Sequence, residues 1–114
     1  MDEANNLHDN LVQELRRGTI ILSVLSRLST PQYGYSLLRV LEDSGFTVEP
    51  GTLYPLLRRL EKQGLLDSSW DTSESRPRRY YHLSEEGEKI YHNLCVEWNK
   101  LIVNMAVLIK QGEE

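Results

Sequence analysis

The sequence predicts a mainly α-helical fold with a small β-hairpin, and three observations lead to this expectation. Apolar residues recur every three or four positions over residues 11–28, which indicates an amphipathic helix with a broad apolar face. Strand-forming residues flank a polar stretch at residues 72–77, which indicates two paired strands. From residue 91 onward, apolar residues follow a heptad spacing within one long helical segment. This order predicts a winged helix-turn-helix followed by a long C-terminal dimerisation helix.

The first two helices are expected to form the base of this fold. The first covers residues 11–28, and its mostly buried stripe contains Leu11, Leu15, Gly18, Ile21, Leu22, Val24, Leu25 and Leu28. The second begins near Thr30, because Pro31 suits the first helical position, and it ends at about Ser44. Gly45 then supplies the left-handed residue at which many helices end. The side chains that this second helix buries are Leu37, Leu38 and Leu41.

A third helix is expected from Pro50 to Gln63, with Gly64 ending it. Its buried face is formed by Leu53, Leu56, Leu57 and Leu60. Pro55 lies inside this helix and removes one backbone hydrogen bond to Gly51, so we expect a distorted first turn.

The opposite face of this third helix carries the candidate DNA contacts, which are Gly51, Thr52, Tyr54, Pro55, Arg58, Arg59 and Lys62. The small residues come early, where a phosphate could approach the backbone, and the Thr52 hydroxyl and amide can meet a phosphate or a base edge. Arg58 and Arg59 suit either guanine readout or phosphate binding, and the sequence does not choose between these roles. Taken alone, such a cationic face is as often merely a solvated surface.

The hairpin is expected to be a cationic wing beside this helix. Its strands cover residues 65–71 and 78–83, with aromatic side chains suited to cross-strand pairing at Trp70, Tyr80 and Tyr81. Three arginines gather at its second strand and in the loop before it, in a pattern that suits contact with the DNA backbone or minor groove: Arg76, Arg78 and Arg79.

The last helix is expected to start after Ser84, which is placed to cap it, and to join two subunits. Its heptad stripe is longer than one small protomer can cover, which favours a homodimer over a monomer whose last helix folds back. The predicted dimer contacts are Leu11, Leu15, Tyr91, Leu94, Trp98, Leu101, Ile102, Met105 and Leu108.

Composition and motifs exclude several other functions. The net charge is −4, yet residues 49–82 carry six cations against five anions, so one cationic surface lies on an acidic chain. The single cysteine, Cys95, allows no intrachain disulfide, and the three histidines are scattered, so neither a metal site nor a cofactor is expected. No phosphate-binding loop or nucleophile motif occurs, so the chain is not expected to be an enzyme. A cytoplasmic location without membrane contact is expected, because no apolar stretch is long enough to span a bilayer.

The ordered segments L-R-R-G-T-I-I-L-S-V-L, Y-G-Y-S-L, G-T-L-Y-P-L-L-R-R-L-E-K-Q-G-L and R-P-R-R-Y-Y-H-L-S-E-E-G resemble the PadR family of bacterial transcriptional regulators. The resemblance covers about residues 15–87. It implies a winged helix-turn-helix dimer that is joined through terminal helices and acts mainly as a repressor.

The resemblance also suggests roles for individual residues. Tyr35 looks like a tyrosine that contacts the DNA backbone, although its ring could instead only pack beneath the helix. Thr52, Tyr54, Pro55 and Arg58 look like the groove-facing set. Arg78 and Arg79 look like the wing contacts.

In small family members that bind flat aromatic drugs, a tryptophan of the last helix lines a pore between subunits. Trp98 falls at the matching place in the heptad stripe, so it is a candidate effector-binding residue, with plain dimer core as the alternative.

The sequence therefore predicts a DNA-binding regulator, a homodimeric repressor that a small-molecule effector releases from an inverted-repeat operator. Residues 1–83 would form the DNA-binding domain, with the first helix also contributing to the dimer, and residues 84–114 would form the dimerisation helix. The competing hypothesis is a winged-helix module that binds proteins and not DNA.

Overall fold

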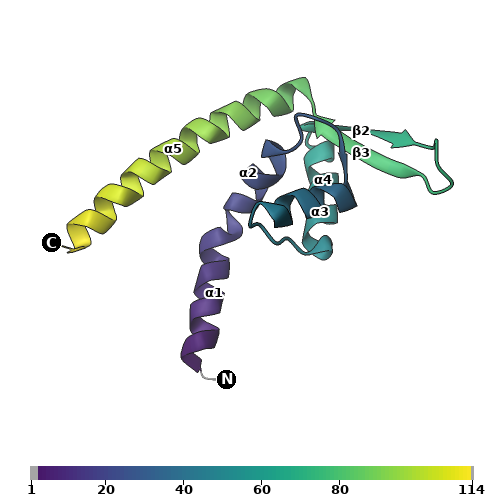
Figure 1. Ribbon diagram of the computed structural model, residues 1–114. Coiled ribbons are helices and arrows are strands. Elements are labelled where there is room, and N and C mark those ends of the chain that lie inside the picture. The colour runs from purple at the N-terminus through teal and green to yellow at the C-terminus, as the bar shows by residue number, and fades with distance from the viewer. Residues whose placement is uncertain (1–2, 114) are drawn as a thin grey trace.

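The computed structural model describes residues 3–113, which form a small body from which two helical arms and a hairpin extend (Figure 1). The mainly α-helical class with a small β-sheet is confirmed. The elements in chain order are α1 (Glu3–Arg17), α2 (Thr19–Ser26), β1 (Gln32–Tyr33), α3 (Gly34–Asp43), α4 (Pro50–Lys62), β2 (Leu66–Asp71), β3 (Arg78–Leu83) and α5 (Glu85–Glu113).

The first predicted helix is in fact two helices, so the prediction of one helix over residues 11–28 is wrong. α1 begins much earlier, at Glu3, and the chain turns at Gly18 before α2 starts. Glycine is about 1 kcal/mol less favourable than alanine inside a helix, which makes Gly18 the weakest point of the predicted helix. The Thr19 hydroxyl donates a hydrogen bond of 2.7 Å to the Arg16 carbonyl at this turn. α2 therefore packs into the body while α1 leads away from it (Figure 1).

The sheet has three strands in the order β1-β3-β2, one more than the predicted hairpin. Gln32 and Tyr33 pair with β3 opposite Tyr81 and Tyr80, so the second predicted helix starts at Gly34 rather than near Thr30. The aromatic cross-strand contact joins Tyr33 and Tyr80, whose ring centroids lie 5.4 Å apart in an edge-to-face arrangement. A two-residue strand carries too little periodicity to be detected in the sequence.

Both glycines predicted to end helices do so in the left-handed conformation, with φ of 90° at Gly45 and 84° at Gly64. The amide of the residue after each glycine donates a hydrogen bond back to the helix. The Phe46 amide donates to the Leu41 carbonyl at 2.8 Å, and the Leu65 amide donates to the Leu60 carbonyl at 3.0 Å. These contacts satisfy carbonyl groups that a helix end otherwise leaves unpaired.

α4 runs as one helix through Pro55, so the proline does not end it. Pro55 lies in the second turn of this helix, and the Glu49 carbonyl accepts the first two amide bonds, from Thr52 and Leu53, each at 2.9 Å. The Gly51 carbonyl therefore lacks its helical donor, but Gly51 is exposed near the helix start, where water can take that place.

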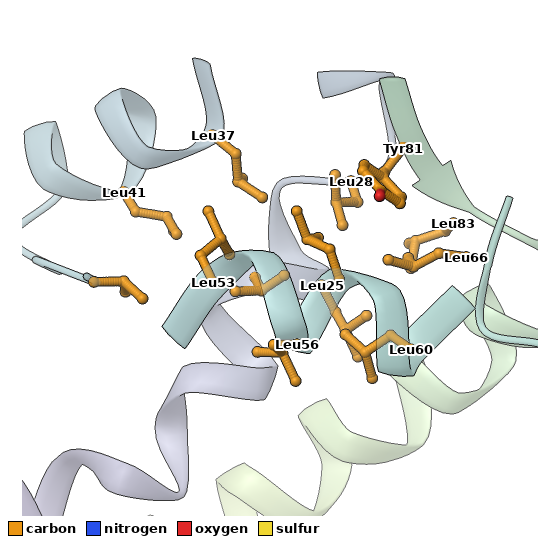
Figure 2. Packing of buried hydrophobic residues seen from close by; sticks show 13 residues of the cluster. Leu25, Leu28, Leu37, Leu41, Leu53, Leu56, Leu60, Leu66, Tyr81 and Leu83 are labelled. Carbon is orange, nitrogen blue, oxygen red and sulfur yellow. The ribbon is translucent and has the colours of Figure 1, made fainter. Parts of the chain in front are cut away.

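The core gathers around the apolar face of α4, as Figure 2 shows. Thirteen side chains from the body and the sheet form one buried cluster. Burying each leucine stabilises the fold by roughly 1.5–3 kcal/mol. The four leucines predicted for this face of α4 are all buried: Leu53, Leu56, Leu57 and Leu60.

Ser84 and Gly87 hold the start of α5 against the two residues just before β2, Gly64 and Leu65. The Ser84 hydroxyl accepts the Gly87 amide at 3.0 Å, as the predicted helix cap requires, and it donates to the Gly64 carbonyl at 2.6 Å. The Ser84 amide donates to the Leu65 carbonyl at 3.0 Å. Gly87 is buried against that same peptide group. The first turn of α5 therefore has a fixed direction relative to the body.

Beyond its first turns, α5 leaves the body, and α1 does the same at the other end of the chain (Figure 1). Leu11 and Leu15 belong to the stripe predicted to be mostly buried. They are 59% and 79% exposed, so the single chain leaves this face of α1 uncovered. α1 contains no buried residue at all, and α5 contains none beyond Gly87 within the residues described. The two arms keep their apolar faces uncovered in the single chain.

Candidate nucleic-acid interface

The outer face of α4 is exposed and cationic, because its leucine face holds the helix against the core. Arg58, Arg59 and Lys62 are exposed, and none forms an ion pair within residues 3–113. Gly51 and Thr52 are exposed at the start of the same helix. The predicted set therefore lies together on one accessible helix, and no carboxylate of the part that the structure describes pairs with these three cations.

Tyr54 connects this helix to α3. Its ring lies directly over Gly34, where a Cβ atom would meet the Tyr54 Cε1 atom at 2.0 Å. Only glycine leaves room for the ring, so the Tyr54 side chain orients α4 across the start of α3. The ring is still partly exposed, which leaves its edge accessible beside Pro55.

Tyr35 is exposed by 55%, so it does not pack beneath α3. Arg39, four residues later on the same helix, donates a hydrogen bond of 3.1 Å to the Tyr35 hydroxyl. This hydrogen bond raises the pKa of Arg39 above its usual value. Sequence reasoning missed Arg39, and the i,i+4 spacing to Tyr35 is the signal that could have found it.

The three wing arginines are not equivalent. Arg76 is exposed and has no ion-pair partner among the described residues. Arg78 lies 3.5 Å from Glu74 and stacks over the Tyr33 ring at 4.7 Å. A hydrogen bond involving Tyr80, followed by the charge of Glu74, raises the pKa of Arg78. Arg76 and Arg78 thus remain on the surface of the wing, where they are accessible.

Arg79 points instead toward α4. Its Nη2 atom lies 2.6 Å from Glu61 Oε1, and its Nε atom donates to the Ser68 hydroxyl at 3.2 Å. The guanidinium also lies 5.8 Å from the Trp70 ring centroid and 5.4 Å from that of Tyr81. The sequence predicted Arg79 as a DNA contact of the wing and gave no sign of its pairing with Glu61, because the two residues are far apart in the sequence.

The predicted dimer residues lie along the two arms. Tyr91 and Leu94 are half-buried against the core, where a hydrogen bond with Cys95 raises the pKa of Tyr91. The others are exposed: Leu11, Leu15, Trp98, Leu101, Ile102, Met105 and Leu108. Sequence reasoning missed a second exposed apolar stripe on α5, formed by Val96, Val103 and Val107, and an exposed leucine on α1, Leu7.

Trp98 borders a mainly apolar cleft of about 400 Å³ between α2, the end of α3 and α5. Other residues around it include Leu22, Phe46, Tyr91 and Cys95. Trp98 is 40% exposed, so it is accessible at the edge of this cleft. This cleft lies within one protomer, whereas the resemblance suggested a pore between subunits.

Within residues 3–113, no helix has both the length and the apolar character needed to cross a membrane. Over the same residues, no group of three or more His, Cys, Asp or Glu side chains is arranged to hold a metal ion.

The comparisons with known proteins agree with this geometry. The model of the Transcriptional regulator PadR-like family matches residues 21–93. A PadR family transcriptional regulator from Eggerthella lenta DSM 2243 has 43% sequence identity and a TM-score of 0.89, with 93% of this chain and 95% of that chain covered. A PadR-like transcription factor from Bacteroides fragilis has 31% identity and a TM-score of 0.73, with 87% and 98% covered. The transcriptional regulator Rv3488 of Mycobacterium tuberculosis is 36% identical over 77 residues, which are 67% of this chain and 72% of that protein.

Two helices that contribute to the core (α2 and α3), an exposed cationic helix (α4) and an adjoining hairpin (β2 and β3) define this chain as a winged helix-turn-helix protein. The matched family model then identifies its lineage, and the chain belongs to the PadR-like family of transcriptional regulators. This family regulates transcription and does not comprise enzymes, as the sequence predicted.

Proposed function

We propose that this chain is a homodimeric repressor that binds an inverted-repeat DNA operator through α4 and the wing. The observation that carries the proposal is the outer face of α4, where Arg58, Arg59 and Lys62 are exposed and unpaired within the described residues. Such a local cationic surface on a chain of net charge −4 favours docking on one defined anionic surface over general polyanion binding.

Three elements supply the proposed DNA contacts. α4 enters the major groove, with its exposed start near a phosphate and its cations further along. Tyr35, held by Arg39, contacts the backbone beside it. Arg76 and Arg78 contact the backbone or the minor groove from the wing. The α4 residues proposed for this interface are Gly51, Thr52, Tyr54, Pro55, Arg58, Arg59 and Lys62.

The homodimer is proposed because the two arms expose stripes of large apolar side chains, and contiguous exposed apolar patches mark interaction surfaces. The α5 stripe from Tyr91 to Leu108 would pack on its copy, and Leu11 and Leu15 of α1 would join the same interface. In this division residues 1–83 form the DNA-binding domain and residues 84–114 the dimerisation helix. Residues 1, 2 and 114 lie outside the described part of the chain.

Footprinting of DNA upstream of the chain's own gene should reveal two protected half-sites related by inverted symmetry. A two-fold dimer places equivalent α4 helices one DNA turn apart, about 34–36 Å, or a multiple of that distance. Light scattering should give twice the mass of one chain. Failure to retard any promoter fragment would favour the protein-binding module, and a monomeric mass would contradict the dimer.

We further propose that a small aromatic effector stacks on Trp98 and thereby releases the operator. The support is the partial exposure of Trp98 at the edge of the apolar cleft. Such a ligand would weaken DNA binding only if it bound one arrangement of the two α4 helices better than another.

Planar aromatic cations such as proflavine are expected to quench the tryptophan emission of the free protein saturably. The Trp98→Ala variant should lose this quench, while Trp70→Phe should keep it because Trp70 lies on the wing. Circular dichroism checks that both variants are folded. A quench that survives in Trp98→Ala would assign Trp98 to the dimer core.

A further inference from the structure

The wing and α4 share one polar cluster, formed by Glu61, Ser68 and Arg79. Glu61 projects from the last turn of α4, Ser68 from β2 and Arg79 from β3. Ser68 donates a hydrogen bond to Glu61 Oε2, while Arg79 donates to Glu61 Oε1 at 2.6 Å and to Ser68 Oγ at 3.2 Å. Each side chain of the cluster therefore contacts the other two.

The cluster is partly shielded from water. The Glu61 side chain is 25% exposed and that of Arg79 is 36% exposed, less than the 40–74% of the arginines in the other ion pairs described. The Arg79 guanidinium also lies near the Trp70 and Tyr81 rings, at 5.8 and 5.4 Å from their centroids. The hydrogen bond from Ser68, together with Arg79, holds the pKa of Glu61 below its usual value.

Glu61 follows Arg58 by three positions and immediately precedes Lys62, so an unpaired carboxylate here would place a negative charge on the cationic helix. Residues three apart on a helix are neighbours, yet Glu61 pairs with Arg79 across the wing and leaves Arg58 free. The pair therefore neutralises a carboxylate beside the proposed DNA surface and fastens the wing to α4.

We propose that Arg79 is a positioning residue, which through Glu61 and Ser68 fixes the wing relative to α4, and that it does not itself bind phosphate. This inference rests on the proposed DNA-binding function. Arg76 and Arg78 then meet the DNA because Arg79 holds their strand in place.

A double-mutant cycle on operator affinity at fixed salt tests this role, using Glu61→Gln, Arg79→Gln and the double variant. If Arg79 positions the wing, each single variant binds about twofold to fivefold more weakly, a range set by partly exposed ion pairs. The double variant should then be no weaker than either single variant. If Arg79 binds phosphate, Glu61→Gln should bind DNA as well as or better than the unmodified chain, because it removes a negative charge and frees the guanidinium. That outcome would overturn the proposal.

The salt dependence of binding provides a second readout. Arg76→Gln should reduce the slope of log affinity against log salt by about 0.9, as the loss of one phosphate contact does. Arg79→Gln should leave this slope nearly unchanged, because Arg76 and Arg78 still contact phosphate in the complex and the variant loses affinity only through the cost of ordering a loosened wing. A reduction equal to that of Arg76→Gln would contradict the positioning role. Asp67→Asn is the matched control for Glu61→Gln. It also removes one carboxylate, but from the exposed side of β2 and outside the cluster.

Hydrogen exchange in the free protein separates this inference from the proposed function. Glu61→Gln should speed amide exchange in β2 and β3 while the amides of α2 and α4 keep their protection. Unchanged exchange in the wing would show that the cluster does not fasten it, whatever the DNA results. If the unmodified chain retarded no fragment, the proposed function would fall, whereas the exchange result would still decide whether Glu61 holds the wing.

Discussion

Replacing Arg58 with alanine is expected to weaken operator binding by about 1–3 kcal/mol if Arg58 reads a base in the major groove. Arg58 lies in the middle of the exposed face of α4, and no carboxylate within the described residues competes for its guanidinium. The side chain contributes nothing to the buried core. The variant should therefore fold normally, and its whole effect should appear in the affinity for DNA.

Gel retardation at fixed salt measures this loss on the footprinted operator and on fragments substituted at single positions. Lost discrimination at one base pair identifies guanine readout, whereas uniform weakening across sequences identifies a phosphate contact. Arg17→Ala is the matched control, because Arg17 is an exposed arginine of α1 whose one ion pair among residues 3–113 is with Glu14. Operator affinity that is unchanged in Arg58→Ala would remove Arg58 from the interface.

Replacing Gly87 with alanine is expected to destabilise the fold by about 1–3 kcal/mol or more, as overpacking of a close contact does. A Cβ atom at this position would lie 2.0 Å from the Leu65 carbonyl oxygen and 2.9 Å from its carbonyl carbon. Backbone atoms cannot rotate aside as a side chain can. The Leu65 carbonyl is also held by the Ser84 amide at 3.0 Å. Alanine would therefore push α5 away from the body.

Thermal unfolding at fixed protein concentration should show a fall in melting temperature of roughly 5–15 °C for Gly87→Ala. Gly112→Ala is the matched control on the same helix, since no atom of the described residues lies within 4 Å of the position of its Cβ. That control should leave the melting temperature nearly unchanged. A Gly87→Ala protein as stable as the control would mean that α5 does not meet the body at this close contact.

Local sequence signals were sufficient for the parts of the fold that depend on neighbours in the chain. The four leucines of α4 repeat with the helical period and are all buried, and Gly45 and Gly64 end their helices with positive φ as predicted. The same period placed Arg58, Arg59 and Lys62 on the exposed face. By contrast, the position of β1 depends on pairing with β3, about fifty residues later, which no local pattern records.

The wing illustrates the same difference at the candidate site. The run of arginines in the sequence predicted a cationic hairpin. It gave no reason to expect different roles for Arg78 and Arg79. Successive side chains of a strand point to opposite faces, so in the fold Arg78 stacks on Tyr33 while Arg79 turns to Glu61. Their different roles come from what lies on each face of the sheet.

The sequence by itself determined the helical class, the wing, the leucine face of α4 and the family, because short-range periodicity and ordered motifs encode each of them. Only the tertiary structure decided where α1 breaks from α2, that a third strand joins the wing, and that Arg79 faces Glu61. Those features arise from contacts between segments far apart in the chain. Their energies depend on the distances and burial that folding creates, and residue order alone does not specify either.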